Sequence, residues 1–385
     1  MTQSQRFPSP RLSLDREILE WMAEARWRFD DARFDALAQK LFAFQFEHCP
    51  AYGRFCEGRG FTPGNVSHWT QIPPVPTGAF KEVELRCFPA SQTVRTFYTS
   101  GTTGQKRGAL PLDTLEIYDA SLLPTLEQLL FPDCRANSTE PWRLPMCILA
   151  PTGHEKPDSS LSHMFDQLVE AHGSPDSRYV VHQGALDLEA IRHAQDGIRT
   201  SGEPWVLLGT AFSFVHLLED MTRHGERWDC PPGSRVMETG GFKGQAREIP
   251  RAELHGWISE RMGIPSSRII NQYGMTELGS QFYDSSLVDP DGPRRKLGPP
   301  WVRVRILDPT TRREVQAGKV GMVVIHDLAN TGSIAAIETA DLGRRVLDSE
   351  GQPIGFEILG REPDAEQRGC SIAADEMLSR AGRPR

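Results

Sequence analysis

The feature that most constrains the fold of this chain is an alternation of short apolar runs with longer amphipathic stretches. Five short runs in the middle of the sequence are rich in residues typical of strands, at residues 93–99, 146–150, 179–181, 204–208 and 234–238. Three longer stretches repeat apolar residues at helical spacing, at residues 112–130, 161–171 and 212–224. Because alternating strands and helices favour parallel sheets covered by helices, we expect an α/β fold.

The two ends of the chain differ from this middle. Apolar spacing predicts helices within residues 12–49, whereas the glycines and prolines of residues 53–78 predict mostly loop. After about residue 296 the pattern changes to short strands with tight turns, at residues 302–307, 320–326 and 354–359. We predict a helical lead, two α/β subdomains and a small β-rich subdomain with a short tail, at residues 1–60, 61–200, 201–295 and 296–385.

The composition argues against several classes of protein. The 385 residues are 38% hydrophobic and carry a formal net charge of -8, whereas a nucleic-acid binder usually presents a basic face. No stretch approaches the roughly 18 apolar residues that span a bilayer, and the N-terminus has no apolar signal core. The 7 cysteines are odd in number and form no C-x-x-C pair, which is typical of free thiols in a reducing cytoplasm. We therefore expect a cytoplasmic protein with neither a membrane span nor a nucleic-acid partner.

A loop rich in glycine and threonine follows the predicted strand at residues 93–99 and precedes the predicted helix at residues 112–130. Its glycines let the backbone bend until several N–H groups face one concavity, and its hydroxyls and two cations add further groups that bind phosphate. The candidate residues are Ser100, Gly101, Thr102, Thr103, Gly104, Lys106, Arg107 and Gly108. The spacing differs from the G-x-x-x-x-G-K-[ST] of a P-loop. The alternative is a solvated loop that only connects a strand to a helix.

Three more segments follow this loop, and they read Asn-Gln-Tyr-Gly-Met-Thr-Glu at 271–277, Thr-Ala-Asp-Leu-Gly at 339–343 and Gly-Phe-Glu-Ile-Leu-Gly-Arg at 355–361. In this order the four segments resemble the adenylate-forming superfamily of acyl-CoA synthetases, adenylation domains and firefly-type luciferases. Thr-Gly-Gly-Phe-Lys-Gly at 239–244 and Arg-Gly-Cys-Ser at 368–371 resemble the LuxE-type acyl-protein synthetases, or long-chain-fatty-acid–luciferin-component ligases. The resemblance implies the large N-terminal domain of the adenylate-forming fold. It also implies ATP-dependent activation of a carboxylic acid, a fatty or other acyl acid, to acyl-AMP with release of pyrophosphate.

The resemblance assigns the phosphates and the metal to particular residues. The loop from Ser100 to Gly108 would hold the β- and γ-phosphates of ATP, Thr276 would contact the α-phosphate, and Glu277 would ligate Mg²⁺. The chemistry agrees, because Mg²⁺ is usually held by one or two carboxylates together with phosphate oxygens. The structural alternative is a Thr-Glu pair that only forms a turn.

The resemblance likewise assigns the nucleoside. Asp341 would bind the ribose hydroxyls, with Arg361 nearby, and Tyr273 would stack on the adenine. The remaining residues of the adenine pocket would be Gly240, Gly241 and Gly274. A tyrosine offers a π-face to a base, and an aspartate accepts two neighbouring hydroxyl hydrogen bonds. A core tyrosine and a capping aspartate are the structural alternatives.

Two departures from the superfamily pattern affect the mechanism. The usual loop reads Thr-Gly-x-Pro-Lys-Gly and this one reads Thr-Gly-Gln-Lys-Arg-Gly, so either Lys106 or Arg107 could face phosphate. Most of the superfamily has a mobile C-terminal domain with a catalytic lysine, but no lysine follows Lys319 here. We therefore expect no such domain. Either adenylation is slow, or Lys243 or Lys106 replaces that lysine, or a partner subunit completes the site.

The acyl acceptor is the last question that the sequence raises. LuxE-type enzymes pass the acyl group to their own cysteine near the C-terminus and then to a reductase, and Cys370 matches that position. An inert thiol is the alternative. The expected partners are a reductase, an acyltransferase or a carrier protein. Two other functions stay open: a ligase for a small aromatic or amino acid with CoA, a carrier protein or a small molecule as acceptor, and a non-catalytic nucleotide-binding partner subunit.

Overall fold

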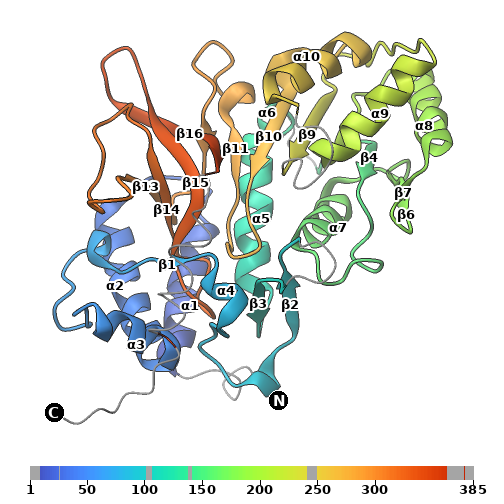
Figure 1. Cartoon of the computed structure of the whole chain (residues 1–385). Coiled ribbons are helices and arrows are strands. Elements are labelled where there is room, and N and C mark those ends of the chain that lie inside the picture. Colours follow the sequence, from blue (N-terminus) through green and yellow to red (C-terminus); the bar gives the residue numbers. More distant parts are fainter. Residues whose placement is uncertain are drawn as a thin grey trace. The chain divides into compact units, whose positions relative to one another are not determined.

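The computed structural model of the chain describes residues 9–25, 27–100, 106–137, 141–240, 249–361 and 377, which group into two compact units (Figure 1). The first unit contains the described residues up to Pro124, Met275–Gln281, and the described residues from Gly298 onward. The second unit contains the described residues of Thr125–Gly274 together with Phe282–Leu297. The four-part division expected from the sequence stays a prediction. None of the helices formed by the described residues has the length and apolar content needed to cross a membrane.

The second unit is built on a mostly parallel sheet in the order β12-β11-β10-β9-β8-β4-β5. Its strands are β4 (Met146–Leu149), β5 (Arg178–Tyr179), β8 (Val206–Thr210), β9 (Arg235–Thr239), β10 (Ile269–Tyr273), β11 (Phe282–Asp284) and β12 (Lys296–Leu297). The five strands from β5 to β10 are parallel, and β11 and β12 join antiparallel. A separate hairpin is formed by β6 (Val181–His182) and β7 (Ala185–Leu186). The parallel arrangement agrees with the α/β fold predicted from the sequence.

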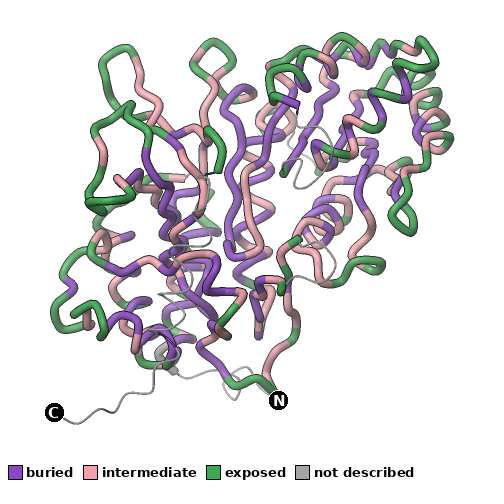
Figure 2. Tube along the Cα trace, in the orientation of Figure 1, coloured by how far each residue is buried: buried purple, intermediate pink, exposed green. Residues whose placement is uncertain are grey.

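Helices pack on this sheet, and three of them share one apolar core with its strands. The helices are α6 (Pro132–Asn137), α7 (Ser160–His172), α8 (Leu188–Ser201), α9 (Ala211–Arg223) and α10 (Arg251–Met262). The core joins β4, β8, β9 and β10 to side chains of α8, α9 and α10, among them Ile191, Phe214, Leu218, Leu254 and Ile258. In Figure 2 the central strands of this unit are buried and the outer helical turns are exposed. Each such side chain contributes roughly 1.5–3 kcal/mol when fully buried, which favours this packing.

The first unit combines helices with an antiparallel sheet of β13 (Val302–Leu307), β14 (Gly321–Asp327), β15 (Ala336–Leu347) and β16 (Pro353–Arg361). The short β1 (Val75–Pro76) pairs with β15 in parallel. The helices are α1 (Ser9–Met22), α2 (Asp31–His48), α3 (Pro50–Gly58), α4 (Ala79–Glu82) and α5 (Glu116–Leu129), of which α5 continues into the second unit. Arg303 of β13 ties the sheet to α2, because it lies 4.5 Å from the ring of Phe34 and pairs with Asp31 at 2.8 Å.

The structure differs from the sequence-based predictions at α3 and after residue 108. Residues 53–78 are mostly loop, as predicted, but the range begins inside α3, which covers Pro50–Gly58. Proline begins this helix at a position where its missing N–H costs nothing, and Gly53 serves packing, since a Cβ there would lie 2.8 Å from the Phe46 carbonyl oxygen. The glycine-rich loop was expected to join a strand to a helix. It joins two antiparallel strands instead, β2 (Arg95–Tyr98) and β3 (Ala109–Leu112).

His326 gives the first unit a specific response to acid. Its side chain is buried in β14, 4.9 Å from the ring of Trp69, and burial lowers its pKa to about 3. Below about pH 6.5 His326 is therefore protonated in the unfolded chain but stays neutral in the folded chain. The free energy of unfolding falls as the pH is lowered through that value. Between pH 7.5 and 5.0 we expect this histidine to cost roughly 2 kcal/mol of the free energy of unfolding.

The variant His326→Leu removes this group, so urea denaturation at both pH values should show a loss smaller by that amount than in the wild type. Equal losses in the two proteins would show that His326 is protonated in the folded state at pH 5.0.

Candidate active site

The base of the glycine-rich hairpin is held by its own hydrogen bonds. Thr99 and Gly108 continue the β2–β3 ladder, with the Thr99 N–H donating to the Gly108 carbonyl at 2.9 Å. The Gly108 N–H in turn donates to the Thr99 hydroxyl oxygen at 2.9 Å. A Cβ on Gly108 would lie 3.1 Å from Thr99 Cγ2 and 3.5 Å from Glu277 Oε1. The predicted phosphate loop and the predicted metal ligand therefore meet at Gly108, although they are far apart in the sequence.

The two cations of this loop have different environments. Arg107 donates from Nε to the Thr99 carbonyl at 2.6 Å and from a terminal nitrogen to the Tyr98 carbonyl at 3.2 Å. Its guanidinium also lies 5.0 Å from the centre of the Tyr98 ring, so it fastens the two arms of the hairpin. Lys106 is 61% exposed and pairs with Glu82 at 3.1 Å. Because exposed ion pairs contribute only about 0–1 kcal/mol, the lysine can leave this partner at little cost.

Thr276 and Glu277 lie in an irregular turn, which we call the acidic turn and define as Met275–Gln281. Thr276 is half-buried and Glu277 is buried. No helix or strand satisfies the backbone here, and the Leu278 N–H donates to the Met275 carbonyl at 3.1 Å. Such a segment needs partners from elsewhere in the fold, because buried polar backbone groups are costly when unpaired.

Those partners come from the segment that begins at the last residue of β14, which we call the support loop and define by residues 327–335. The carboxylate of Asp327 accepts from the Ser280 N–H and from the Ser280 hydroxyl, both at 2.8 Å. Burial raises the pKa of Asp327 to about 6. Asn330 donates to the Glu277 carbonyl at 2.7 Å. The acidic turn also touches this loop directly, since a Cβ on Gly279 would lie 2.8 Å from Ala329 Cβ and 3.0 Å from the Ala329 carbonyl carbon.

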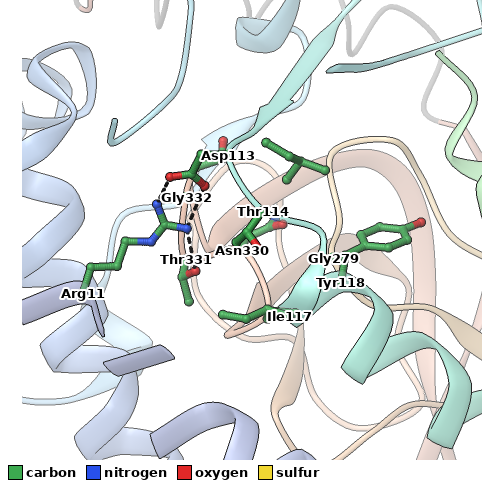
Figure 3. Close-up of a pocket in the computed structure, with 12 residues that line it drawn as sticks. Arg11, Asp113, Thr114, Ile117, Tyr118, Gly279, Asn330, Thr331 and Gly332 are labelled. Carbon is green, nitrogen blue, oxygen red and sulfur yellow. Dashed lines mark hydrogen bonds and ion pairs between the residues drawn. The ribbon is translucent and has the colours of Figure 1, made fainter. Parts of the chain in front are cut away.

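A small cavity lies beside the support loop, close to a buried ion pair (Figure 3). Arg11 of α1 donates to both carboxylate oxygens of Asp113, at 2.5 and 2.9 Å, and to the Thr331 hydroxyl at 3.4 Å. Burial also raises the pKa of the neighbouring Asp15 to about 6. The cavity volume of about 10 Å³ is the space of one water molecule, too small for a substrate.

Asp341 and Arg361, the two residues assigned to the ribose, lie side by side. They are paired across β15 and β16, and Arg361 Nε lies 3.5 Å from Asp341 Oδ1. The Asp341 side chain is 15% exposed and that of Arg361 is 51% exposed. The antiparallel register brings them together from two separate sequence segments.

The adenine candidates of the second unit lie where parallel strands end. Gly240 follows β9, with a positive φ of 79°, and Tyr273 is the last residue of β10. The paired strands place Thr239 opposite Gln272, so both candidates lie at the carboxyl edge of the sheet, where open α/β sheets bind ligands. The half-buried Tyr273 ring lies 6.0 Å from that of Phe282. Gly274 follows directly and is also half-buried.

Several other predicted residues lie outside the described part of the chain. They are Gly101, Thr102, Thr103, Gly104, Gly241, Lys243 and Cys370. Ser100 is described and exposed. Within the described ranges, no three His, Cys, Asp or Glu side chains converge on a metal position. The sequence analysis did not point to Asp327 or Asn330, which follow the strand predicted at residues 320–326.

The comparisons with known proteins bear on these motifs. The family model described as acyl-protein synthetase, LuxE, matches residues 11–379. This chain belongs to that family. It is therefore a ligase of the adenylate-forming class, as the order of the sequence motifs predicted. Two relatives are named long-chain-fatty-acid–luciferin-component ligase. The one from Aliivibrio fischeri is 23% identical, over 92% of this chain and 91% of the relative, and the one from Vibrio harveyi is 24% identical, over 89% and 87%.

Solved structures agree on the fold of this LuxE-family chain. A crystal structure of 2-hydroxyisobutyryl-CoA ligase in the postadenylation state, in complex with 2-HIB-AMP, superposes with a TM-score of 0.61 at 16% identity. The match covers 86% of this chain and 67% of that one. An open conformation of the same ligase with 2-HIB-AMP and CoA gives a TM-score of 0.60 at 16% identity, over 87% and 71%. These likenesses show the adenylate-forming fold.

The contact between the acidic turn and the support loop predicts that two Gly→Ala variants change the stability of the protein in opposite directions. Gly279→Ala should destabilise the protein by about 1–3 kcal/mol, because the added methyl would meet Ala329 and overpack the contact. Gly197→Ala is the matched control, since Gly197 lies inside α8 with open space around its Cβ position. Alanine there should stabilise by about 0.5–1 kcal/mol. Chemical denaturation of both variants measures this, and a Gly279→Ala protein as stable as the wild type would contradict the close approach.

Proposed function

We propose that this chain uses ATP and Mg²⁺ to activate a long-chain fatty acid as acyl-AMP, and then passes the acyl group to the thiol of Cys370. Family membership supports the ligase chemistry, and the names of the two relatives support the acid. The acceptor rests on the position of Cys370 in the sequence. A reductase, an acyltransferase or a carrier protein would then receive the acyl group.

The observation that carries the proposal is the position of Glu277 against Gly108. The carboxylate of Glu277 is buried at the base of the glycine-rich hairpin, 3.5 Å from where a Cβ on Gly108 would lie. A hard carboxylate oxygen beside a loop rich in N–H and hydroxyl donors suits Mg²⁺ held together with phosphate. Glu277 would hold the ion, which when bound offsets the negative charge of the phosphates. Thr276, next to it, would contact the α-phosphate.

The phosphate-binding cation in this proposal is Lys106. Arg107 already binds two carbonyls of the hairpin, whereas Lys106 is exposed and pairs with Glu82 at the surface. The backbone and hydroxyls of residues 100–108 would hold the β- and γ-phosphates. Lys106, Lys243 or a residue of a partner subunit would take the role of the lysine that other members of the superfamily carry in their C-terminal domain.

The nucleoside would be bound by the residues that the sequence motifs assign to it. Asp341 would accept hydrogen bonds from the ribose hydroxyls, and Arg361 lies beside that carboxylate, with Nε 3.5 Å from Oδ1. Tyr273 would stack on the adenine, with Gly240, Gly241 and Gly274 lining the pocket. With ATP held in this way, an oxygen of the fatty acid carboxylate attacks the α-phosphorus. The bond to the bridging oxygen breaks, and pyrophosphate leaves with its electron pair.

The other cysteines, all of them among the described residues, are poor nucleophiles. This supports Cys370 as the acceptor. Burial raises the pKa of Cys56, Cys147 and Cys230 to about 12, so almost none of each is thiolate at neutral pH. Burial raises the pKa of Cys87 and Cys134 as well. A hydrogen bond from the Cys87 side chain lowers the pKa of Cys49, but that thiol is only 1% exposed. An acceptor must meet the acyl-AMP as a thiolate.

Replacing Glu277 tests the adenylation half of the proposal. Glu277→Gln keeps the shape and removes the charge, so acid-dependent exchange of pyrophosphate into ATP should fall by about 100-fold or more. Glu260→Gln is the control, because Glu260 is an exposed partner of Arg227 and should leave the rate unchanged. A screen over fatty, aromatic and amino acids identifies the substrate. Exchange with none of them, in a protein that still binds ATP, would instead support the non-catalytic nucleotide-binding partner subunit.

Replacing Cys370 tests the transfer half. With ATP and radiolabelled fatty acid, the wild type should carry label that neutral hydroxylamine releases, as a thioester does. Cys370→Ser should lose that label and keep pyrophosphate exchange, because adenylation comes first. The matched control is Cys134→Ser, a half-buried thiol that should stay labelled like the wild type. Label that survives Cys370→Ser would assign the carrier to another residue, and an active but unlabelled wild type would point to a diffusible acceptor.

A further inference from the structure

The buried amide of Asn330 binds the backbone of the residue that carries the proposed metal ligand. Its Nδ2 donates to the Glu277 carbonyl at 2.7 Å and to the Ile334 carbonyl at 3.2 Å. The side chain is 3% exposed, so water does not compete for these bonds. One amide group therefore links the acidic turn to the end of the support loop.

The support loop is itself fixed to α2. Gln45, which is buried, donates from Nε2 to the Asn330 carbonyl at 2.8 Å and accepts from the Ala335 N–H at 3.1 Å. Its amide thus bridges both ends of the segment that contains Asn330. The position of Asn330 is set by a helix of the first unit, and little freedom is left to its side chain.

The far end of the acidic turn is fixed independently, by the bonds from Ser280 to Asp327 and by the contact between Gly279 and Ala329. Between this end and Met275, the bond from Asn330 reaches the backbone of Glu277 itself. The direction of the Cα–Cβ bond follows from the orientation of the flanking peptide units, and the rotamers of the side chain start from that bond. Holding the Glu277 carbonyl therefore limits where the Glu277 carboxylate can point.

We propose that Asn330 is a positioning residue, which acts through the Glu277 carbonyl to aim the Glu277 carboxylate at the Mg²⁺ bound with ATP. The inference rests on the proposed function, because it needs Glu277 to be the metal ligand. Groups that orient a ligand in this way commonly change metal affinity by about 10–100-fold when they are replaced.

The sharpest variant is Asn330→Asp, which keeps the shape and replaces the donating NH₂ by an oxygen. An oxygen facing the carbonyls of Glu277 and Ile334 would repel both, so the acidic turn would lose its hold on Glu277. Asn330→Ala removes the donor without adding charge, and it decides the question if the aspartate variant does not fold. Asn65→Asp is the matched control, since Asn65 donates to the Gly60 carbonyl at 2.8 Å in an exposed turn.

The measurement is ATP binding by calorimetry without any acid, once in excess MgCl₂ and once in excess EDTA. The ratio of the two dissociation constants gives the magnesium increment of each protein. We expect Asn330→Asp to lower this increment at least about tenfold while leaving the affinity in EDTA unchanged. Asn65→Asp should match the wild type. A merely structural role for Asn330 would weaken ATP binding equally in both solutions, and that result would overturn the proposal.

A double-mutant cycle separates this inference from the proposed function. If Asn330 acts through Glu277, then Glu277→Gln with Asn330→Asp should have the same magnesium increment as Glu277→Gln alone. Additive losses would show that Asn330 acts elsewhere. If Asn330→Asp keeps the magnesium increment of the wild type while Glu277→Gln loses it, the inference is overturned and the proposed function stands. If Glu277→Gln keeps the magnesium increment of the wild type, or if the wild type shows no increment, then Glu277 is not the metal ligand. The inference about Asn330 would then fail as well.

Discussion

The candidate site depends on how the fold satisfies the backbone of a turn that has no helix or strand of its own. Met275–Gln281 carries Thr276 and Glu277, and the support loop provides its partners through Asp327 and Asn330. Because a buried unpaired N–H or carbonyl costs about 1–3 kcal/mol, an unsupported turn would adopt another conformation. The support loop therefore decides whether the carboxylate of Glu277 faces the base of the glycine-rich hairpin.

This support is built in layers that lead away from the reacting groups. Asn330 touches the acidic turn, and Gln45 of α2 holds the loop that carries Asn330. Arg11 of α1 reaches the same loop through Thr331 while pairing with Asp113. The N-terminal helices therefore do more than cover the antiparallel sheet. They also fix the support loop, which in turn holds the acidic turn.

Much of the fold could be predicted from local pattern. The strand predicted at residues 302–307 is β13, because Val and Arg alternate there with the period of two that a half-buried strand needs. The predicted helix at residues 212–224 differs from α9 by one residue at each end, since one face of it is apolar. The long strand β15 is missing from the prediction. Its second half is only partly buried and pairs with β16. The sequence there shows no regular alternation of apolar and polar residues.

The glycine-rich loop shows where local pattern stops being informative. Residues 109–112 are too few to show an alternating pattern, and they include a proline, so no strand was predicted there. They nevertheless form β3, which pairs with β2 in a hairpin. Both strands of a two-stranded sheet are edge strands, in which the missing N–H of a proline is tolerated. A loop between two strands and a loop between a strand and a helix have the same composition. Only the pairing partner distinguishes them.

The sequence by itself determined the chemistry of this protein: which carboxylates, hydroxyls, glycines and aromatic rings are present, and the order of motifs that places it among the adenylate-forming ligases. The tertiary structure alone decided which of these groups meet. Glu277 lies against Gly108, Arg361 lies beside Asp341, and Asn330 holds the Glu277 carbonyl. These contacts join residues far apart in the chain. They follow from strand register and from backbone packing, which no local pattern of residues encodes.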